Sequence, residues 1–149
     1  DGYEGNAGGY YELTREEVLA ADFAKDFSGK VVKLLRRGVL ALPPGDYRVI
    51  YMRRDGEETR QSAQALFRRA IAPQVAGQID RATTEIVRLL SERSDVDVLE
   101  VQHRAVMERP EQEFERIAAS GWPIDAVKAA SVVDPSQWRF RREQLDVGA

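Results

Sequence analysis

Apolar residues recur at helical spacing along residues 61–93, and this is the clearest periodic pattern in the chain. Val75, Ile79, Ala82, Ile86 and Leu89 follow one another at steps of four, three, four and three, which is the spacing of one face of an α-helix. A helix with this much apolar surface is not stable alone, so we expect the other elements to pack onto it.

Pro73 interrupts this stretch. Proline has no backbone N–H to donate, and its ring clashes with the preceding helical turn. The sequence therefore predicts two helical segments, about 62–71 and 73–93, joined by a kink or a short break.

Residues 47–52 are the best strand candidate. Tyr47, Val49 and Tyr51 alternate with residues that are themselves partly apolar, so both faces of this strand carry apolar groups. The pair Asp55-Gly56 follows, which is a strong signal for a two-residue hairpin turn. We therefore expect an antiparallel hairpin whose short, polar return strand covers 57–61.

Helix signals frame the rest of the chain. Thr14 and Glu17 form a capping-box pattern that predicts a helix over 14–27, and a short second helix is expected over 30–37. Further on, Pro110 and Gly121 mark the two ends of another helix, and a shorter one follows Trp122-Pro123. The segment 97–106 fits a strand or a helix, and its valine content favours the strand.

These elements predict an α+β fold that is predominantly helical. It would hold five to six helices around a small antiparallel β-hairpin or sheet, with a central kinked helix at about 61–93. The glycine-rich residues 1–9 are expected to be a flexible linker, and residues 10–149 to form a single domain that is part of a larger protein.

Composition narrows the functional classes. The chain has 149 residues, of which 43% are hydrophobic and 32% charged, with a net charge of −3. This balance argues against a general nucleic-acid or membrane-surface binder, although it allows a local basic patch. There is no cysteine, and no apolar run approaches the ~18 residues of a membrane span. We expect a cytoplasmic protein, and the excess of arginine over lysine is typical of a bacterial or phage source.

Candidate catalytic chemistry is sparse. His103 is the only histidine, whereas the common zinc sites need two or more histidine or cysteine ligands. Glu100 and His103 share a face only if their segment is helical. Asp95 and Asp97 form a D-x-D pair that could hold a cation, but helix capping and a solvated turn explain it as well. We therefore predict no metal, no cofactor and no catalytic residue.

Two surface groups stand out as binding candidates. Residues 114–131 loosely resemble a DNA-binding helix-turn-helix and also a ubiquitin-associated module, although Lys128 is the only basic residue of the second helix and a plain helical hairpin is the alternative. The predicted protein-interaction residues combine aromatic and basic side chains: Trp122, Trp138, Arg139, Phe140, Arg141 and Arg142. The possible anion or nucleic-acid contacts are Lys30, Lys33, Arg36 and Arg37.

Three functional classes remain open from the sequence. The first is a non-catalytic protein-interaction or assembly module of a larger protein, with a protein partner or self-association. The second is a nucleic-acid-associated domain that uses the helix at 30–37 and the tail at 138–142, with binding that falls as salt rises. The third is an enzyme or effector that uses His103 with Glu100, Asp97 and Arg104.

Overall fold

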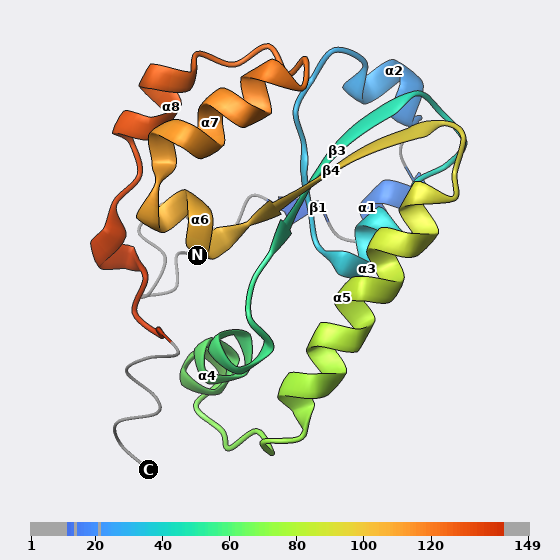
Figure 1. Cartoon of the computed structure of the whole chain (residues 1–149). Helices are drawn as coiled ribbons and strands as arrows, with labels where there is room; N and C mark the ends of the chain where they lie inside the picture. The colour runs from blue at the N-terminus through green and yellow to red at the C-terminus, as the bar shows by residue number, and fades with distance from the viewer. Residues whose placement is uncertain (1–11, 14, 21, 142–149) are drawn as a thin grey trace.

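Two parallel strands, β3 (Tyr47–Arg53) and β4 (Val96–Gln102), form the centre of the structure. Their register runs from Tyr47 opposite Val96 to Arg53 opposite Gln102. Parallel neighbours need a long crossover, and here it consists of α4 (Gly56–Phe67) and α5 (Val75–Ser91) (Figure 1). The computed structural model describes residues 12–13, 15–20 and 22–141, so the expected linker at 1–9 and Arg142 lie outside the described residues.

The predicted antiparallel hairpin is therefore wrong. Asp55 does not turn the chain back. Instead its Oδ1 accepts hydrogen bonds from the backbone N–H groups of Glu57, at 2.9 Å, and Glu58, at 3.1 Å. These bonds satisfy amides at the start of a helix that have no intrahelical partner. The same Asp-Gly pair thus begins α4, and residues 57–61 are helical.

The expected interruption near Pro73 is confirmed as a break between two helices. α4 ends at Arg68, whose φ of 50° is left-handed, and α5 begins at Val75. Residues 61–93 are therefore not one kinked helix. On α5, Ile86 and Leu90 are buried, whereas Leu89 is 38% exposed, so the predicted apolar stripe is wrong at its last position.

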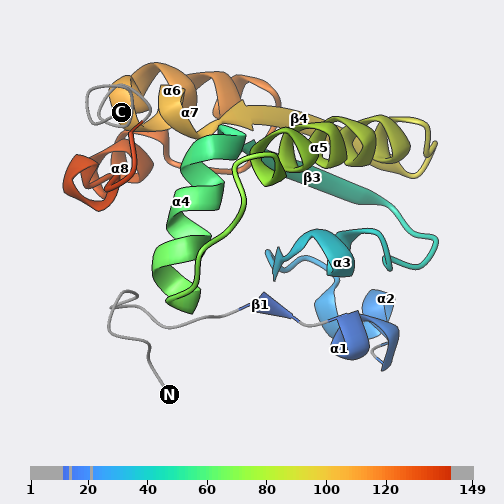
Figure 2. The same ribbon diagram turned by 90° about the horizontal axis from the view of Figure 1, so that it is seen from below.

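Helices cover both faces of the β3–β4 pair (Figures 1 and 2). Successive strand residues point to opposite faces. Val49 and Val98 accordingly pack into a core with Ile86 and Leu90 of α5, while Ile50 packs on the opposite side. Parallel strands that are covered on both faces carry apolar residues at nearly every position, and this explains the absence of strict polar alternation in β3.

The amino-terminal elements differ from the sequence prediction. Thr14, the predicted start of the first helix, lies outside the described residues. The described part of the helix expected over 14–27 forms two shorter helices, α1 (Arg15–Ala20) and α2 (Phe23–Phe27), and Asp22 caps the second. The helix expected over 30–37 is wrong, because β2 (Lys33–Leu34) pairs there in parallel with β1 (Glu12–Leu13). Only α3 (Arg36–Val39) is helical. Val18 of α1 and Val39 of α3 join the core beneath α5.

The carboxyl-terminal half matches the prediction more closely. The ambiguous segment 97–106 is a strand up to Gln102 and then becomes α6 (His103–Glu108). Next come α7 (Pro110–Ala119), α8 (Ala126–Ser131) and a short 3₁₀ turn, η1 (Pro135–Gln137). A mainly helical α+β structure is therefore confirmed. Within the described residues, no helix is both long and apolar enough to cross a membrane.

Candidate ligand-binding site

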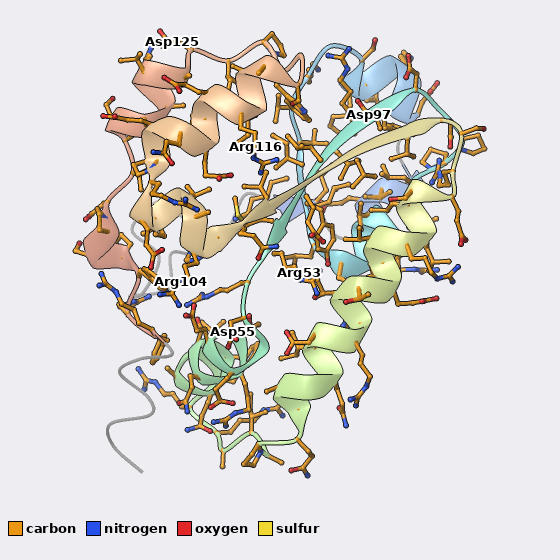
Figure 3. The ribbon with its side chains drawn as sticks, in the orientation of Figure 1. Arg53, Asp55, Asp97, Arg104, Arg116 and Asp125 are labelled. Carbon is orange, nitrogen blue, oxygen red and sulfur yellow. The ribbon has the colours of Figure 1, made fainter. Side chains whose placement is uncertain are left out.

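A cavity of about 310 Å³ lies where β3 and β4 end, and we call it the carboxyl-edge pocket. Parallel strands place their carboxyl ends at one edge of the sheet, and α/β proteins commonly bind ligands outside that edge. Figure 3 shows Arg53, Asp55 and Arg104 reaching this region from three different elements. The lining is almost entirely charged and consists of Arg53, Arg54, Asp55, Glu58, Asp80, Gln102 and Arg104.

Arg53 is held in place by two contacts. Its Nη1 lies 3.0 Å from Glu100 Oε2, and its Nη2 donates to Thr84 Oγ1 at 3.0 Å. Glu100 lies on β4 two residues before Gln102, which pairs with Arg53, and Thr84 lies on α5. Both ends of the guanidinium are therefore occupied, so this side chain joins the sheet to α5.

Arg54 has spare hydrogen-bonding capacity. Its Nε donates to Glu58 Oε2 at 3.3 Å, and its two Nη groups make no hydrogen bond within the described part of the chain. The side chain is 26% exposed. Since a guanidinium carries five N–H donors, four of them remain available on the wall of the pocket.

Asp80 and Gln102 supply further open polar atoms. Neither side chain makes a hydrogen bond or ion pair with the described residues. The Asp80 carboxylate lies directly over Gly56, because a β-carbon at that glycine would be 2.7 Å from Asp80 Oδ2. The missing side chain of Gly56 therefore lets α5 bring an acceptor to the start of α4.

Glu58 forms a buried wall behind the pocket. Its side chain is 4% exposed, and its Oε2 accepts hydrogen bonds from Arg54 Nε and from the indole Nε1 of Trp138 at 2.9 Å. A carboxylate that is removed from water needs such donors. Figure 1 shows η1, which precedes Trp138, beside α6.

His103 lies next to this buried group. Its ring meets Trp138 edge to face, with ring centroids 6.0 Å apart, and its buried Nδ1 has no partner among the described residues. Burial lowers the pKa of His103, the positive charge of Arg54 lowers it further, and Glu58 acts in the opposite direction. The imidazole is therefore a neutral packing group at pH 7.

A larger, open hollow of about 730 Å³ lies at the other end of the strands. Its charged groups bind one another: Arg93 forms two hydrogen bonds to Asp95, at 2.9 and 2.7 Å, and Arg93 also donates to the backbone oxygens of Leu42 and Pro43. The N–H of Gly45 donates to Asp95 as well. This arrangement fastens the loop before β3 to β4, so we assign it a structural role.

The predicted interaction residues are partly buried. Trp138 is only 5% exposed, and Trp122 is half-buried against the core formed by Val101 and Ile117. Arg141 lies over the Trp138 ring, with 4.8 Å between its Cζ and the ring centroid. Arg139 is exposed and Phe140 is half-buried. The role of this group in protein binding remains a prediction.

The structure does not bring the two predicted basic groups together. Lys30 donates to the backbone oxygen of Asp26, Lys33 lies in β2 and Arg36 is exposed on α3. Arg37 also lies in α3, and the structure does not describe its side chain. Figures 1 and 2 place α3 and η1 well apart, so a single basic face made of both groups has no support.

The residues of the predicted enzyme are also dispersed. Arg104 lines the pocket, but Glu100 is bound to Arg53, and Asp97 lies near the opposite end of β4, about 16 Å from Gln102 at the usual strand rise. Asp95 belongs to the Arg93 contact. Within the described residues, no three histidine, cysteine or acidic side chains are grouped to hold a metal ion.

Most residues of the pocket were not among those predicted from the sequence. Asp55 and Glu58 are spaced like a capping box, which could have marked the start of α4. Arg53 and Gln102 end adjacent parallel strands and Arg54 follows Arg53 directly, and this neighbourhood is recognisable only when the pairing is known. Neither a protein-family model, nor a curated protein, nor a solved structure matches this chain.

Proposed function

We propose that the carboxyl-edge pocket binds a small ligand that carries an oxyanion, such as a phosphate, sulfate or carboxylate group. The observation that carries the proposal is the pair of free Nη groups on Arg54. A guanidinium presents its donors in a planar fork that matches two oxygens of an oxyanion. Because Glu58 contacts only the Nε side, it anchors the base of this fork and leaves its tip available.

The other open groups define the rest of the ligand. The Asp80 carboxylate accepts hydrogen bonds, and the Gln102 amide can donate or accept. A ligand that pairs with all three side chains therefore bears a hydroxyl or amino group beside its oxyanion. The cavity of about 310 Å³ is at the small end of typical ligand sites, roughly 300–1,000 Å³.

The charge of the pocket limits the charge of the ligand. All three lining arginines are paired with a carboxylate: Arg53 with Glu100, Arg104 with Glu108 at 2.8 Å, and Arg54 with Glu58. In Arg54 this pairing uses only Nε, and both Nη groups make no hydrogen bond within the described residues. One such guanidinium suits a single oxyanion better than a polyphosphate. The α4 amides add little, because the Asp55 side chain already accepts from two of them.

Titration of the protein with inorganic phosphate and sulfate tests the proposal. We expect saturable binding, observed by two-dimensional NMR, which Arg54→Gln weakens by about ten- to a hundredfold, as expected for a lost charged hydrogen bond. Arg36→Gln is the matched control, because Arg36 is exposed on α3. An equal loss with Arg36→Gln, or no binding to the wild-type protein, would overturn the proposal.

The alternatives from the sequence remain predictions. A nucleic-acid domain that uses the 30–37 segment would lose binding with Arg36→Gln rather than Arg54→Gln. A protein-interaction module would bind a partner whether or not the pocket is filled. The Arg36 and Arg54 variants therefore separate anion binding in the pocket from nucleic-acid binding by the 30–37 segment in one set of samples.

A further inference from the structure

We infer that Trp138 is a positioning residue for the carboxyl-edge pocket, through which the carboxyl-terminal segment controls anion binding by Arg54. This inference rests on the proposed function. Trp138 itself does not line the pocket. It acts through Glu58, whose Oε2 accepts from the Trp138 indole N–H and also from Arg54 Nε.

The shared oxygen fixes the direction in which Arg54 points. Glu58 is almost fully buried, and its side chain lies between the indole and the guanidinium. Without the indole donor, the carboxylate has one hydrogen bond fewer inside the protein and gains by drawing more of the Arg54 guanidinium towards itself. The free Nη groups would then turn away from the pocket.

Trp138 also supports a second side chain of the same pocket. Arg104 lies over the indole, with 5.9 Å between its Cζ and the ring centroid, and Arg141 lies over the same ring at 4.8 Å. Cations are attracted to the face of an indole ring. One buried side chain from the carboxyl-terminal segment therefore contacts, directly or through Glu58, two of the three arginines that line the pocket.

Hydrogen bonds within residues 134–141 fix the backbone on both sides of Trp138. Asp134 accepts from the backbone N–H of Ser136 at 2.9 Å, and Pro135 starts η1. The turn ends at Trp138, whose backbone N–H donates to the Pro135 oxygen. Arg141 then donates to the oxygens of Trp138 and Pro135, which holds the end of the turn over the ring.

Trp138→Phe tests the inference, because phenylalanine keeps an aromatic ring and removes the N–H donor. We expect inorganic phosphate to bind roughly two- to tenfold more weakly, the loss of about one hydrogen bond. Trp122→Phe is the matched control, since Trp122 packs against the core formed by Val101 and Ile117, and it should leave phosphate affinity unchanged. Equal affinity of the Trp138→Phe variant and the wild-type protein would overturn the inference.

A ligand-free measurement keeps this test separate from the proposed function. The Arg54 Nε–H resonance in NMR spectra should shift in Trp138→Phe and remain in place in Trp122→Phe. If the wild-type protein binds no phosphate but this shift occurs, the proposed function fails and the positioning role stands. If the resonance does not move, the positioning role fails even if phosphate binds.

A second variant covers the case in which Trp138→Phe does not fold. Glu58→Gln keeps a side-chain acceptor at the same place but removes its charge. It should move both the Trp138 indole N–H resonance and the Arg54 Nε–H resonance. Failure of either resonance to respond would overturn the relay through Glu58.

Discussion

Gly56 and Ala76 are in such close contact that a β-carbon on Gly56 would collide with the Ala76 carbonyl oxygen. This contact joins the start of α4 to the start of α5 and places Asp80 above the pocket. Gly56→Ala should therefore lower the free energy of unfolding by about 1–3 kcal/mol, the usual cost of overpacking. Chemical denaturation measures this change.

Gly77→Ala is the control for that measurement. A β-carbon at Gly77, also in the first turn of α5, would meet only Arg81 Nη1, at an ordinary 3.5 Å. This variant should be neutral or stabilising by up to about 1 kcal/mol, because alanine favours the helix. Similar effects of the two substitutions would contradict the close contact between the helices.

The titration of His103 tests the buried group behind the pocket. Burial and the charge of Arg54 lower the pKa of His103, so the imidazole should titrate below its usual value of about 6.5. Arg54→Gln removes a positive charge and should raise this pKa. Because the chain has one histidine, its ring proton resonances report the titration without overlap.

The same pKa shift determines how stability depends on pH. The unfolded chain binds a proton on His103 before the folded protein does, so unfolding is favoured as the pH falls below about 6.5. The stability that the neutral ring provides is fully present above about pH 6.5 and is lost as the pH falls through the pKa of His103 in the folded protein. A ring pKa above 6.5, or one that does not respond to Arg54→Gln, would contradict this arrangement.

Asp95 should stabilise the amino end of the strands in a pH-dependent way. Hydrogen bonds from Arg93, and then from the Gly45 N–H, lower the pKa of Asp95. The stabilisation is therefore present above the unfolded pKa of about 3.9 and is lost as the pH falls further. Asp95→Asn should lower Tm at pH 7, and the difference from wild type should shrink below about pH 4.

The neighbouring Asp46→Asn is the control for Asp95. Asp46 is exposed in the same hollow and makes no hydrogen bond with the described residues. Its substitution should leave Tm nearly unchanged at both pH values. A difference between Asp95→Asn and wild type that is independent of pH would show that the Arg93 pairing is not its cause.

Local patterns predicted the helices better than the sheet. Pro73 marked a real break, and Pro110 marked the start of α7. Asp55-Gly56 misled because the same pair suits a hairpin turn and a helix start. The choice between them depends on whether β3 finds its partner nearby or in β4, and no local pattern contains that information.

The pocket could not be predicted from the sequence for the same reason. Its open groups come from the end of β3, from α5 and from the end of β4, and only the parallel register places Arg54 near Gln102. Trp138 was predicted to be an interaction residue because it lies in a segment of aromatic and basic side chains. Its burial, however, depends on the position of Glu58 on α4. Sequence reasoning identified the residue and could not identify its partner.

The parallel pairing of β3 with β4 also governs the order in which this chain can fold. Tyr47 meets a partner that is synthesised about fifty residues later, so closing this loop carries an entropic cost before any ladder bond forms. Until β4 has been synthesised, the apolar faces of β3 are open to other chains. α4 and α5 contact each other directly, and their early association would shorten the flexible part of this loop and lower the entropic cost of closing it.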